Sequence, residues 1–275
     1  MLEFPEVNVI SKELNENICG KTVERVMPPT KLHKFCWFNG KPEDYESKIK
    51  KSKVSFVEGF GLYVEISFDN GFKLCFNDGV NARLISACDA PKDYQLLILF
   101  GGGEAIVFTV AMYGGIVLQD GGYGNEYYLK SKSAVSPLSE EFDKLYYKTF
   151  SESSPKLSAK AFLATEQRFP GIGNGVLQDI LFSAGINPKR KIGLLSEEEK
   201  ENLLYSIRNV LKDMTEKGGR DTEKDIFGRT GGYKTQLSKN TFADGCPLCG
   251  GEIVKEAYLG GAVYYCPKCQ PLIKD

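Results

Sequence analysis

Apolar positions follow two different periods along the chain, and the change of period divides it into regions. Near the N-terminus, Val7, Ile10, Leu14 and Ile18 recur at spacings of three and four. This spacing predicts an amphipathic helix over residues 6–20, because residues three and four apart lie on the same face of a helix.

The next region is typical of β-strands. Short runs rich in Val, Ile, Phe and Tyr are separated by turn signals such as Asp69-Asn70-Gly71 and Gly101-Gly102-Gly103. The predicted strands cover residues 22–26, 53–57, 61–68, 72–76, 82–87, 94–100, 105–110 and 115–119. Antiparallel strands at this spacing favour a β-sandwich or a barrel, with the first helix packed on it.

A helical pattern begins near residue 136. Ser139 and Ser196 have the form of helix N-caps, and Glu199 follows Ser196 at the third position, as in a capping box. The predicted helices cover residues 139–150, 158–166, 173–184 and 196–217. Residues 218–244 are polar and contain several glycines, so we expect a connector loop there.

The strongest chemical signal lies in the last thirty residues. Cys246 and Cys249 form one Cys-x-x-Cys pair, and Cys266 and Cys269 form a second after sixteen intervening residues. This spacing suits four thiolates around one tetrahedral Zn²⁺ at a hairpin, the alternative being disulfides or singly buried cysteines. Four cysteine ligands leave no position for water, so we expect one structural zinc ion and no catalytic role for it.

The segment from Phe169 to Asn174 joins two predicted helices through a glycine turn. Its glycines, Gly173 among them, let the backbone approach a partner, and the N–H groups at the next helix start can bind a phosphate. Asn174 can donate its side-chain amide to the same phosphate, or simply cap the helix. The basic run that contains Lys189 and Arg190 favours the phosphate interpretation, although such runs are often solvated faces.

Composition sets limits on the function. A chain of 275 residues can hold two domains and a small module. Its formal net charge of −1 argues weakly against nucleic-acid binding, although a basic face can exist on a neutral protein. There is no apolar run long enough for a membrane span, and cysteines used for metal suit a reducing compartment. We expect a cytoplasmic protein without membrane contact.

Three motifs in order resemble the formamidopyrimidine-DNA glycosylase and endonuclease VIII family of base-excision repair enzymes. The family opens Met-Pro-Glu-Leu-Pro-Glu-Val, and this chain opens Met1-Leu2-Glu3-Phe4-Pro5-Glu6-Val7. Residues 167–188 resemble the helix-two-turns-helix element of the family, and residues 246–270 resemble its zinc hairpin. The resemblance covers essentially the whole chain.

The resemblance implies an α+β multidomain fold. It comprises an N-terminal antiparallel β-sandwich with an N-terminal helix (1–130), a helix-two-turns-helix domain (135–217), a connector (218–244) and a zinc-finger hairpin (245–275). Duplex DNA, intact or damaged, would lie in the cleft between the first two domains. The DNA contacts would come from Gly173, Asn174, Lys189 and Arg190. We expect a monomer, either cytoplasmic or associated with the nucleoid.

The catalytic positions depart from the family pattern. The family attacks the sugar with the amine of an N-terminal proline, and Leu2 stands at that position. Leu62 stands where the family has a lysine. The catalytic carboxylates of the family are matched by Glu3, the general acid, and Glu6.

Three further matched places lack the family's side chains. The loop that inserts arginine and phenylalanine into the duplex falls on residues 110–115, which contain no arginine. The inserted methionine falls near Val80, and the phosphate-binding arginine of the zinc hairpin falls on Gly261.

These departures favour a DNA-binding member of the family with lost or altered glycosylase and lyase chemistry. One alternative is an active glycosylase that uses a non-proline terminal amine or water activated by Glu3. Another is a module that binds RNA or protein. Base recognition would fall in residues 218–240, where we expect Arg220, Arg229 and Tyr233 to be solvated loop residues.

Overall fold

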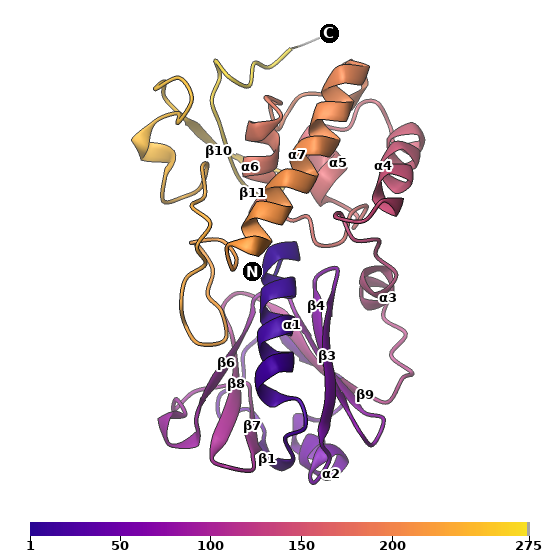
Figure 1. Ribbon diagram of the computed structural model, residues 1–275, viewed down its shortest axis with the longest axis vertical. Coiled ribbons are helices and arrows are strands. Elements are labelled where there is room, and N and C mark those ends of the chain that lie inside the picture. Colours follow the sequence, from indigo (N-terminus) through magenta and orange to yellow (C-terminus); the bar gives the residue numbers. More distant parts are fainter. Residues whose placement is uncertain (274–275) are drawn as a thin grey trace.

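Two β-sheets and helix α1 form the lower half of the molecule in Figure 1, a computed structural model that describes residues 1–273. One sheet has the strand order β1-β7-β8-β6 and the other the order β2-β9-β5-β4-β3. The strands are β1 (Val23–Met27), β2 (Cys36–Phe38), β3 (Val54–Phe60), β4 (Tyr63–Phe68), β5 (Lys73–Asn77), β6 (Val80–Ser86), β7 (Leu96–Phe100), β8 (Glu104–Val110) and β9 (Gly114–Gln119). The prediction of a sandwich is confirmed, because neither sheet closes into a barrel.

Helix α1 (Phe4–Ile18) packs on the sandwich along β3. The four residues whose spacing predicted it, Val7, Ile10, Leu14 and Ile18, are all buried in the same core as the inward-facing strand residues. Burial of one such side chain contributes about 1.5–3 kcal/mol. The helix is therefore held by its apolar face, as the pattern predicted.

Three short elements in this half were not predicted. Strand β2 is parallel to β9, whereas the other strand pairs of the two sheets are antiparallel. Helices α2 (Tyr45–Ile49) and α3 (Glu126–Lys132) have 5 and 7 residues. Segments this short span too few turns to show a helical period in the sequence.

The upper half is helical and has its own core. It contains α4 (Glu141–Glu152), α5 (Ala159–Ala164), α6 (Val176–Ser183) and α7 (Glu197–Glu216). Ser196 accepts the backbone N–H of Glu199, so the predicted capping box forms. Ser139 is not the cap of α4, which begins two residues later than predicted.

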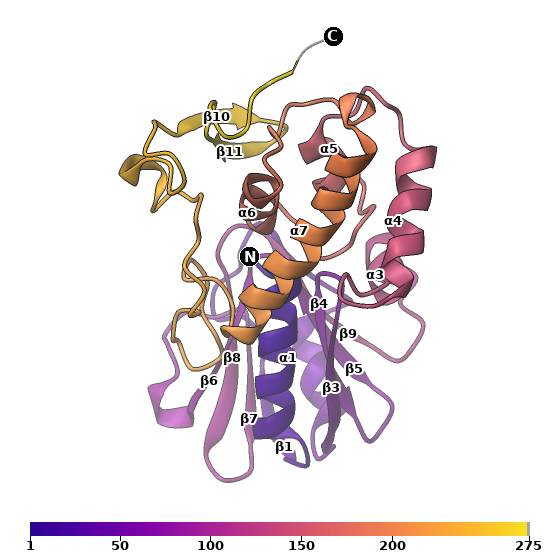
Figure 2. The same ribbon diagram turned by 45° about the horizontal axis from the view of Figure 1, so that its top comes forward.

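The C-terminal hairpin pairs β10 (Val254–Tyr258) with β11 (Gly261–Tyr265) and lies beside α6 (Figure 2). Two polar side chains fasten it to the helices. Asn187 donates its side-chain amide to the carbonyl of Gln270 at 3.0 Å, and Gln270 donates to the carbonyl of Ile186 at 2.9 Å. No helix in residues 1–273 is long and apolar enough to cross a bilayer.

Residues 218–244 are more than a connector. Ile226 is buried in the sandwich core, Tyr233 in the helical core and Leu237 in the core under the hairpin. This segment therefore touches all three parts of the fold, and it brings Arg220 and Glu223 to the N-terminus.

Candidate nucleic-acid interface

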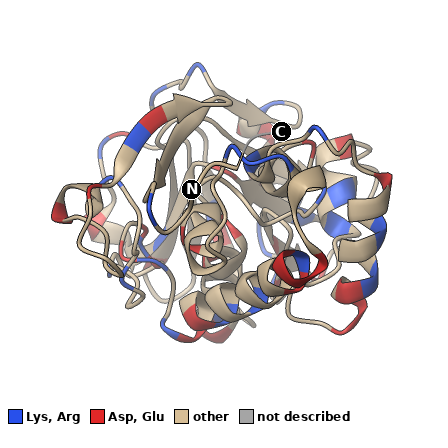
Figure 3. Ribbon diagram, turned by 90° about the horizontal axis from the view of Figure 1, so that it is seen from above, with Lys and Arg blue, Asp and Glu red and all other residues tan. Residues whose placement is uncertain are grey.

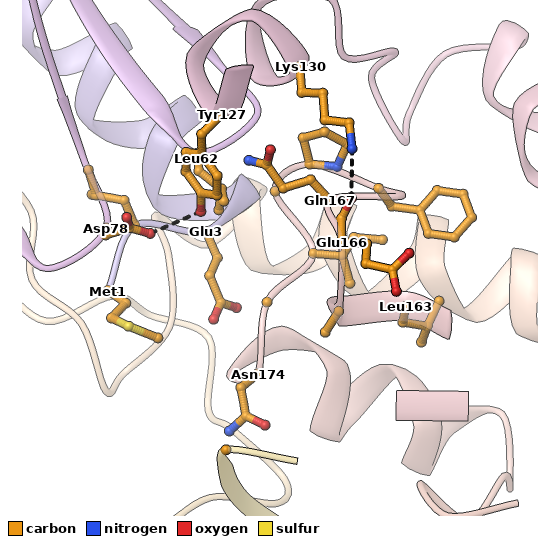
Figure 4. Close-up of a pocket in the computed structure, with 18 of the residues that line it drawn as sticks. Met1, Glu3, Leu62, Asp78, Tyr127, Lys130, Leu163, Glu166, Gln167 and Asn174 are labelled. Atoms are coloured by element: carbon orange, nitrogen blue, oxygen red, sulfur yellow. Dashed lines mark hydrogen bonds between the residues drawn. The ribbon is translucent and has the colours of Figure 1, made fainter. Parts of the chain in front are cut away.

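A cavity of about 770 Å³ lies between the β-sandwich and the helices, and Gly260 at the tip of the C-terminal hairpin lines it. Its walls come from the N-terminus, the β3–β4 turn, α3, the glycine turn before α6 and the hairpin tip. The residues that line it include Met1, Leu2, Glu3, Leu62, Asp78, Tyr113, Tyr127, Lys130, Glu166, Gly173, Asn174 and Gly260. Figure 4 shows Glu3 in the middle of this group, with Asn174 below it.

The N-terminal amine is held at one side of the cavity. It forms an ion pair with the carboxylate of Glu223 at 2.5 Å. The next residue, Leu2, is buried in the sandwich core, and its N–H donates to the carbonyl of Asp78 at 2.7 Å. The residue that matches the catalytic proline is thus a core side chain, and the free amine lies one residue before it.

Glu3 and Glu6 share one buried guanidinium. Arg220 contacts Glu3 at 3.3 Å and Glu6 at 2.7 Å, and all three side chains are less than 5% exposed. Arg220 also donates its Nε to Glu6 at 2.9 Å. The expectation that Arg220 is a solvated loop residue is wrong, because its charge is compensated by carboxylates more than 200 positions away in the chain.

Glu3 is also the acceptor at the start of α6. Its carboxylate accepts hydrogen bonds from the backbone N–H groups of Gly175 at 2.9 Å and Val176 at 2.7 Å. Burial raises the pKa of Glu3, while Arg220 and these N–H groups act in the opposite direction. The carboxylate oxygens are engaged by structural partners, which is poor geometry for a group that must exchange a proton with a substrate.

Gly173 and Asn174 line the cavity just before these N–H groups. The side-chain amide of Asn174 donates to the carbonyl of Ala262 in the hairpin at 3.1 Å, which uses one of its two hydrogens. A Cβ atom on Gly261 would lie 3.2 Å from the Asn174 side chain. Glycine at the position of the family's arginine therefore lets the hairpin tip pack closely against Asn174.

Lys189 and Arg190 do not line the cavity. Lys189 pairs with Glu256 of the hairpin at 2.9 Å. Arg190 is buried, donates to the carbonyl of Leu194 at 2.9 Å and pairs with Glu199 at 2.5 Å. Their charges join parts of the fold, and a DNA contact by Arg190 does not fit its burial.

Lys130 is the basic side chain among the lining residues, and the sequence reasoning missed it. It extends from α3 and donates to the carbonyl of Glu166 at 3.1 Å. The signal for α3 was weak, consisting of Asn125 as an N-cap and lysines in the last turn. Figure 3 shows basic and acidic positions interspersed along the helices.

Asp78 and Tyr127 add polar groups near the N-terminus. The Tyr127 hydroxyl donates to Asp78 at 3.3 Å, drawn as a dashed line in Figure 4. Burial raises the pKa of Asp78 to about 6. Asp78 therefore holds a proton at a higher pH than an exposed aspartate does.

The four cysteines of the hairpin meet as predicted. Their sulfur atoms all lie within 4.8 Å of one another, and none forms a disulfide. The Cys246–Cys269 and Cys249–Cys266 sulfur pairs are 3.8 and 3.6 Å apart. Zinc–sulfur bonds of ~2.3 Å in a tetrahedron require sulfur separations of about 3.8 Å. The cluster can therefore hold a metal ion of this size.

Comparison with known proteins gives full-length relatives. A formamidopyrimidine-DNA glycosylase of Carboxydothermus hydrogenoformans is 29% identical over 98% of this chain and 100% of its own length. Its counterpart in Lactococcus lactis is 26% identical over 98% of this chain and 99% of its own. Over nearly its full length the chain is thus similar to formamidopyrimidine-DNA glycosylases. No protein-family model matches the chain.

Solved structures of the family have the same fold. A Lactococcus lactis Fpg structure superposes with a TM-score of 0.84 at 22% identity, covering 98% of this chain and 99% of the other. The Thermus thermophilus MutM (Fpg) structure gives a TM-score of 0.82 at 22% identity, covering 99% and 100%.

Proposed function

We propose that this protein binds duplex DNA across the cavity between the β-sandwich and the helices, and that it lacks the amine-based glycosylase and lyase chemistry of its family. The observation that carries the proposal is the N-terminus, where Leu2 is buried and the Met1 amine is paired with Glu223. The DNA-binding half rests on the fold and the cavity, and the chemical half rests on this geometry.

DNA binding is supported by the family's solved complexes. The Lactococcus lactis Fpg structure that superposes on this chain is a complex with DNA that contains an abasic site. In this chain, Gly173 and Asn174 line the cavity, and Lys130 supplies a cation from α3. We propose that these three residues contact the DNA backbone, a contact that positions the duplex without reading its sequence.

The loss of amine chemistry follows from the position of the nitrogen. If Met1 is retained, the amine lies one residue, about 3.5 Å, from the place of the proline nitrogen. Misplacement of a reacting group by ~1 Å already costs about a hundredfold in rate. The ion pair with Glu223 also holds the amine in a fixed place, whereas an amine nucleophile must be placed against the sugar.

The rest of the catalytic apparatus agrees with this reading. Leu62 presents an apolar side chain to the cavity where the family has lysine. Glu3, the alternative activator of water, is occupied by Arg220 and the start of α6. Without a placed amine or a free Glu3 carboxylate, the cavity is better suited to holding DNA than to cleaving it.

The metal site has a structural part in this proposal. We propose that Cys246, Cys249, Cys266 and Cys269 hold one Zn²⁺, which supplies cross-linking of the hairpin and no catalysis. The hairpin then presses its tip against Asn174 and keeps the cavity wall in place. The protein would act on DNA as a monomer, and damaged sites are its proposed targets.

The test is DNA binding in a salt series. Fluorescence anisotropy with labelled intact duplex, abasic duplex and structured RNA should give tighter binding to the DNA, weakening as salt rises. Lys130→Met should weaken binding and lower the slope of log K against log salt by about one, since each phosphate contact contributes ~0.9.

Lys148→Met is the matched control. Lys148 is an exposed lysine on α4 outside the cavity and should leave binding unchanged. Preference for RNA, or binding that does not respond to salt, would contradict the DNA-binding proposal.

A further inference from the structure

Five large apolar side chains stand exposed on two neighbouring segments of the sandwich. They are Leu32, Phe35, Trp37, Met112 and Tyr113, which we call the apolar ridge. Trp37, the single tryptophan of the chain, is 54% exposed, and Met112 is 63% exposed. Exposed apolar side chains on neighbouring segments mark an interaction site more often than scattered ones do.

The two segments are fixed to each other by the backbone. Strand β2 pairs in parallel with β9, and Gly114 donates its N–H to the carbonyl of Phe35 at 3.0 Å. The rings of Trp37 and Tyr113 are tilted by 57°, with their centroids 6.4 Å apart. Trp37 therefore lies in a paired strand, and the other four side chains lie in the segments directly before β2 and β9.

The tip of the second segment is fixed as well. Gly79 donates to the carbonyl of Tyr113 at 2.9 Å and accepts from Ala111 at 3.1 Å. A Cβ atom on Gly79 would lie 2.7 Å from the Tyr113 carbonyl oxygen, so only glycine allows this approach. Met112 and Tyr113 are thus held outward by a turn that other residues would disturb.

The apolar ridge is continuous with the cavity. Tyr113 belongs to both, since it lines the cavity and its hydroxyl lies 3.9 Å from the sulfur of Met1. From there the ridge passes to Trp37 at the edge of the five-stranded sheet. The aromatic rings of Tyr113 and Trp37 therefore border the cavity on this side.

The charged residues near the apolar ridge indicate which class of molecule it could bind. Residues 31–37 include Lys31 and Lys34 and no acidic residue, and residues 111–114 include no charge at all. Lys31 lies 3.9 Å from Asp93, so Lys34 is the clearer source of positive charge. Lys34 lies over the Phe35 ring at 5.3 Å. Exposed aromatic rings beside lysines suit nucleobases, which stack through their faces and carry a phosphate backbone. Five side chains are few compared with the roughly 20–30 residues that each partner gives a stable protein interface.

We propose that the apolar ridge is a stacking platform for unpaired bases of the bound DNA, so that the protein prefers duplexes with a bulge or gap to fully paired ones. This inference rests on the proposed DNA binding and extends it. Met112 and Tyr113 fall where the family loop enters the duplex, whereas residues 32–37 lie outside every motif that carries the family resemblance. Trp37 supplies the outer stacking surface.

The single tryptophan makes the proposal directly measurable. Titration with a duplex carrying a three-nucleotide bulge should quench the Trp37 fluorescence, and the fully paired duplex should quench it much less. Anisotropy should show that Trp37→Ala weakens binding to the bulged duplex on the order of tenfold, because each stacked base contributes that much or more. Trp37→Phe should keep most of the affinity, since it keeps an aromatic face.

Phe56→Ala is the matched control. Phe56 is also an exposed aromatic residue, but it lies on β3 at the opposite edge of the same sheet. It should leave binding to both duplexes unchanged.

Three results would overturn the inference. Equal binding of bulged and paired duplexes without a change in fluorescence would remove the platform and leave the proposed DNA binding intact. A dimer in sedimentation that Trp37→Ala dissociates would make the apolar ridge a contact between two copies of the chain. Failure to bind any DNA would overturn both proposals together.

Discussion

Removal of the Arg220 guanidinium is the substitution that we expect to cost most stability. Arg220→Met leaves the carboxylates of Glu3 and Glu6 buried without their shared cation, and both side chains are less than 5% exposed. Breaking a buried ion pair by removing one partner costs about 3–5 kcal/mol. Two carboxylates lose their partner here, so we expect the upper part of that range.

The loss should depend on pH in a defined direction. Without Arg220, burial raises the pKa of Glu3 further above its unfolded value, because the opposing charge is gone. The native variant then binds more protons than the unfolded chain, so its stability falls as pH rises. The deficit relative to the wild type should be smaller at pH 5 than at pH 8.

Urea denaturation followed by circular dichroism measures this loss. Arg229→Met is the matched control, because Arg229 also pairs with two carboxylates, Glu13 and Asp225, but its side chain is 66% exposed. It should lose only a small fraction of what Arg220→Met loses. Glu3→Gln with Glu6→Gln in the Arg220→Met background should recover part of the stability. Equal losses for the two arginine variants would refute the assignment of a buried charge cluster.

Three further outcomes follow from the site geometry. Zinc release assayed with a chromogenic chelator should give one ion per chain, and Cys266→Ala should abolish it and lower the melting temperature; a chain without zinc at full stability would contradict the metal assignment. Burial raises the pKa of Asp78 to about 6, so the native state binds a proton between the unfolded value of 3.8 and 6, and stability falls as pH rises through that window. In urea denaturation, the free energy of unfolding of Asp78→Asn minus that of the wild type should therefore be about 1–2 kcal/mol larger at pH 8 than at pH 4. The same difference at both pH values would contradict the shift. Burial acts to raise the pKa of Glu65, but hydrogen bonds from Cys75, Tyr128, Lys132 and Lys73 hold it at about 2. Stability present above pH 4.5 is therefore lost as the pH falls toward 2. Glu65→Gln should remove this acid-dependent part of the stability, and a variant that keeps the wild-type acid profile would argue against it.

The periodic parts of the fold could be predicted from the sequence. Val7, Ile10, Leu14 and Ile18 revealed α1 because each lies on one buried face. The strands were visible from their turn signals. Strand β2 was not predicted because it has only three residues, Cys36–Phe38, and all three are apolar, so the sequence shows no alternation.

The local chemical signals could also be predicted, and the long-range ones could not. The four cysteines revealed their cluster because their spacing is itself a property of the sequence. Arg220 gave no such signal, since its partners are at the other end of the chain and local polarity suggested solvent. Arg190 looked like part of a solvated basic run, yet it is buried and paired with Glu199.

The exposed apolar residues were not predicted either, because the sequence suggested that they are buried. Trp37 and Tyr113 are apolar, and an apolar residue in a strand region is ordinarily assigned to the core. Their exposure depends on the parallel pairing of β2 with β9 at a sheet edge, which local sequence does not specify. The apolar ridge is therefore a property of the tertiary structure alone.

Borohydride trapping on abasic duplex DNA tests the central claim most directly. A formamidopyrimidine-DNA glycosylase serves as the positive control, and native binding of the same DNA is measured in parallel. We expect this protein to bind the duplex and to give no covalent complex, because the Met1 amine is displaced and paired with Glu223. A trapped complex at ordinary enzyme levels, abolished by acetylation of the N-terminal amine, would contradict the claim.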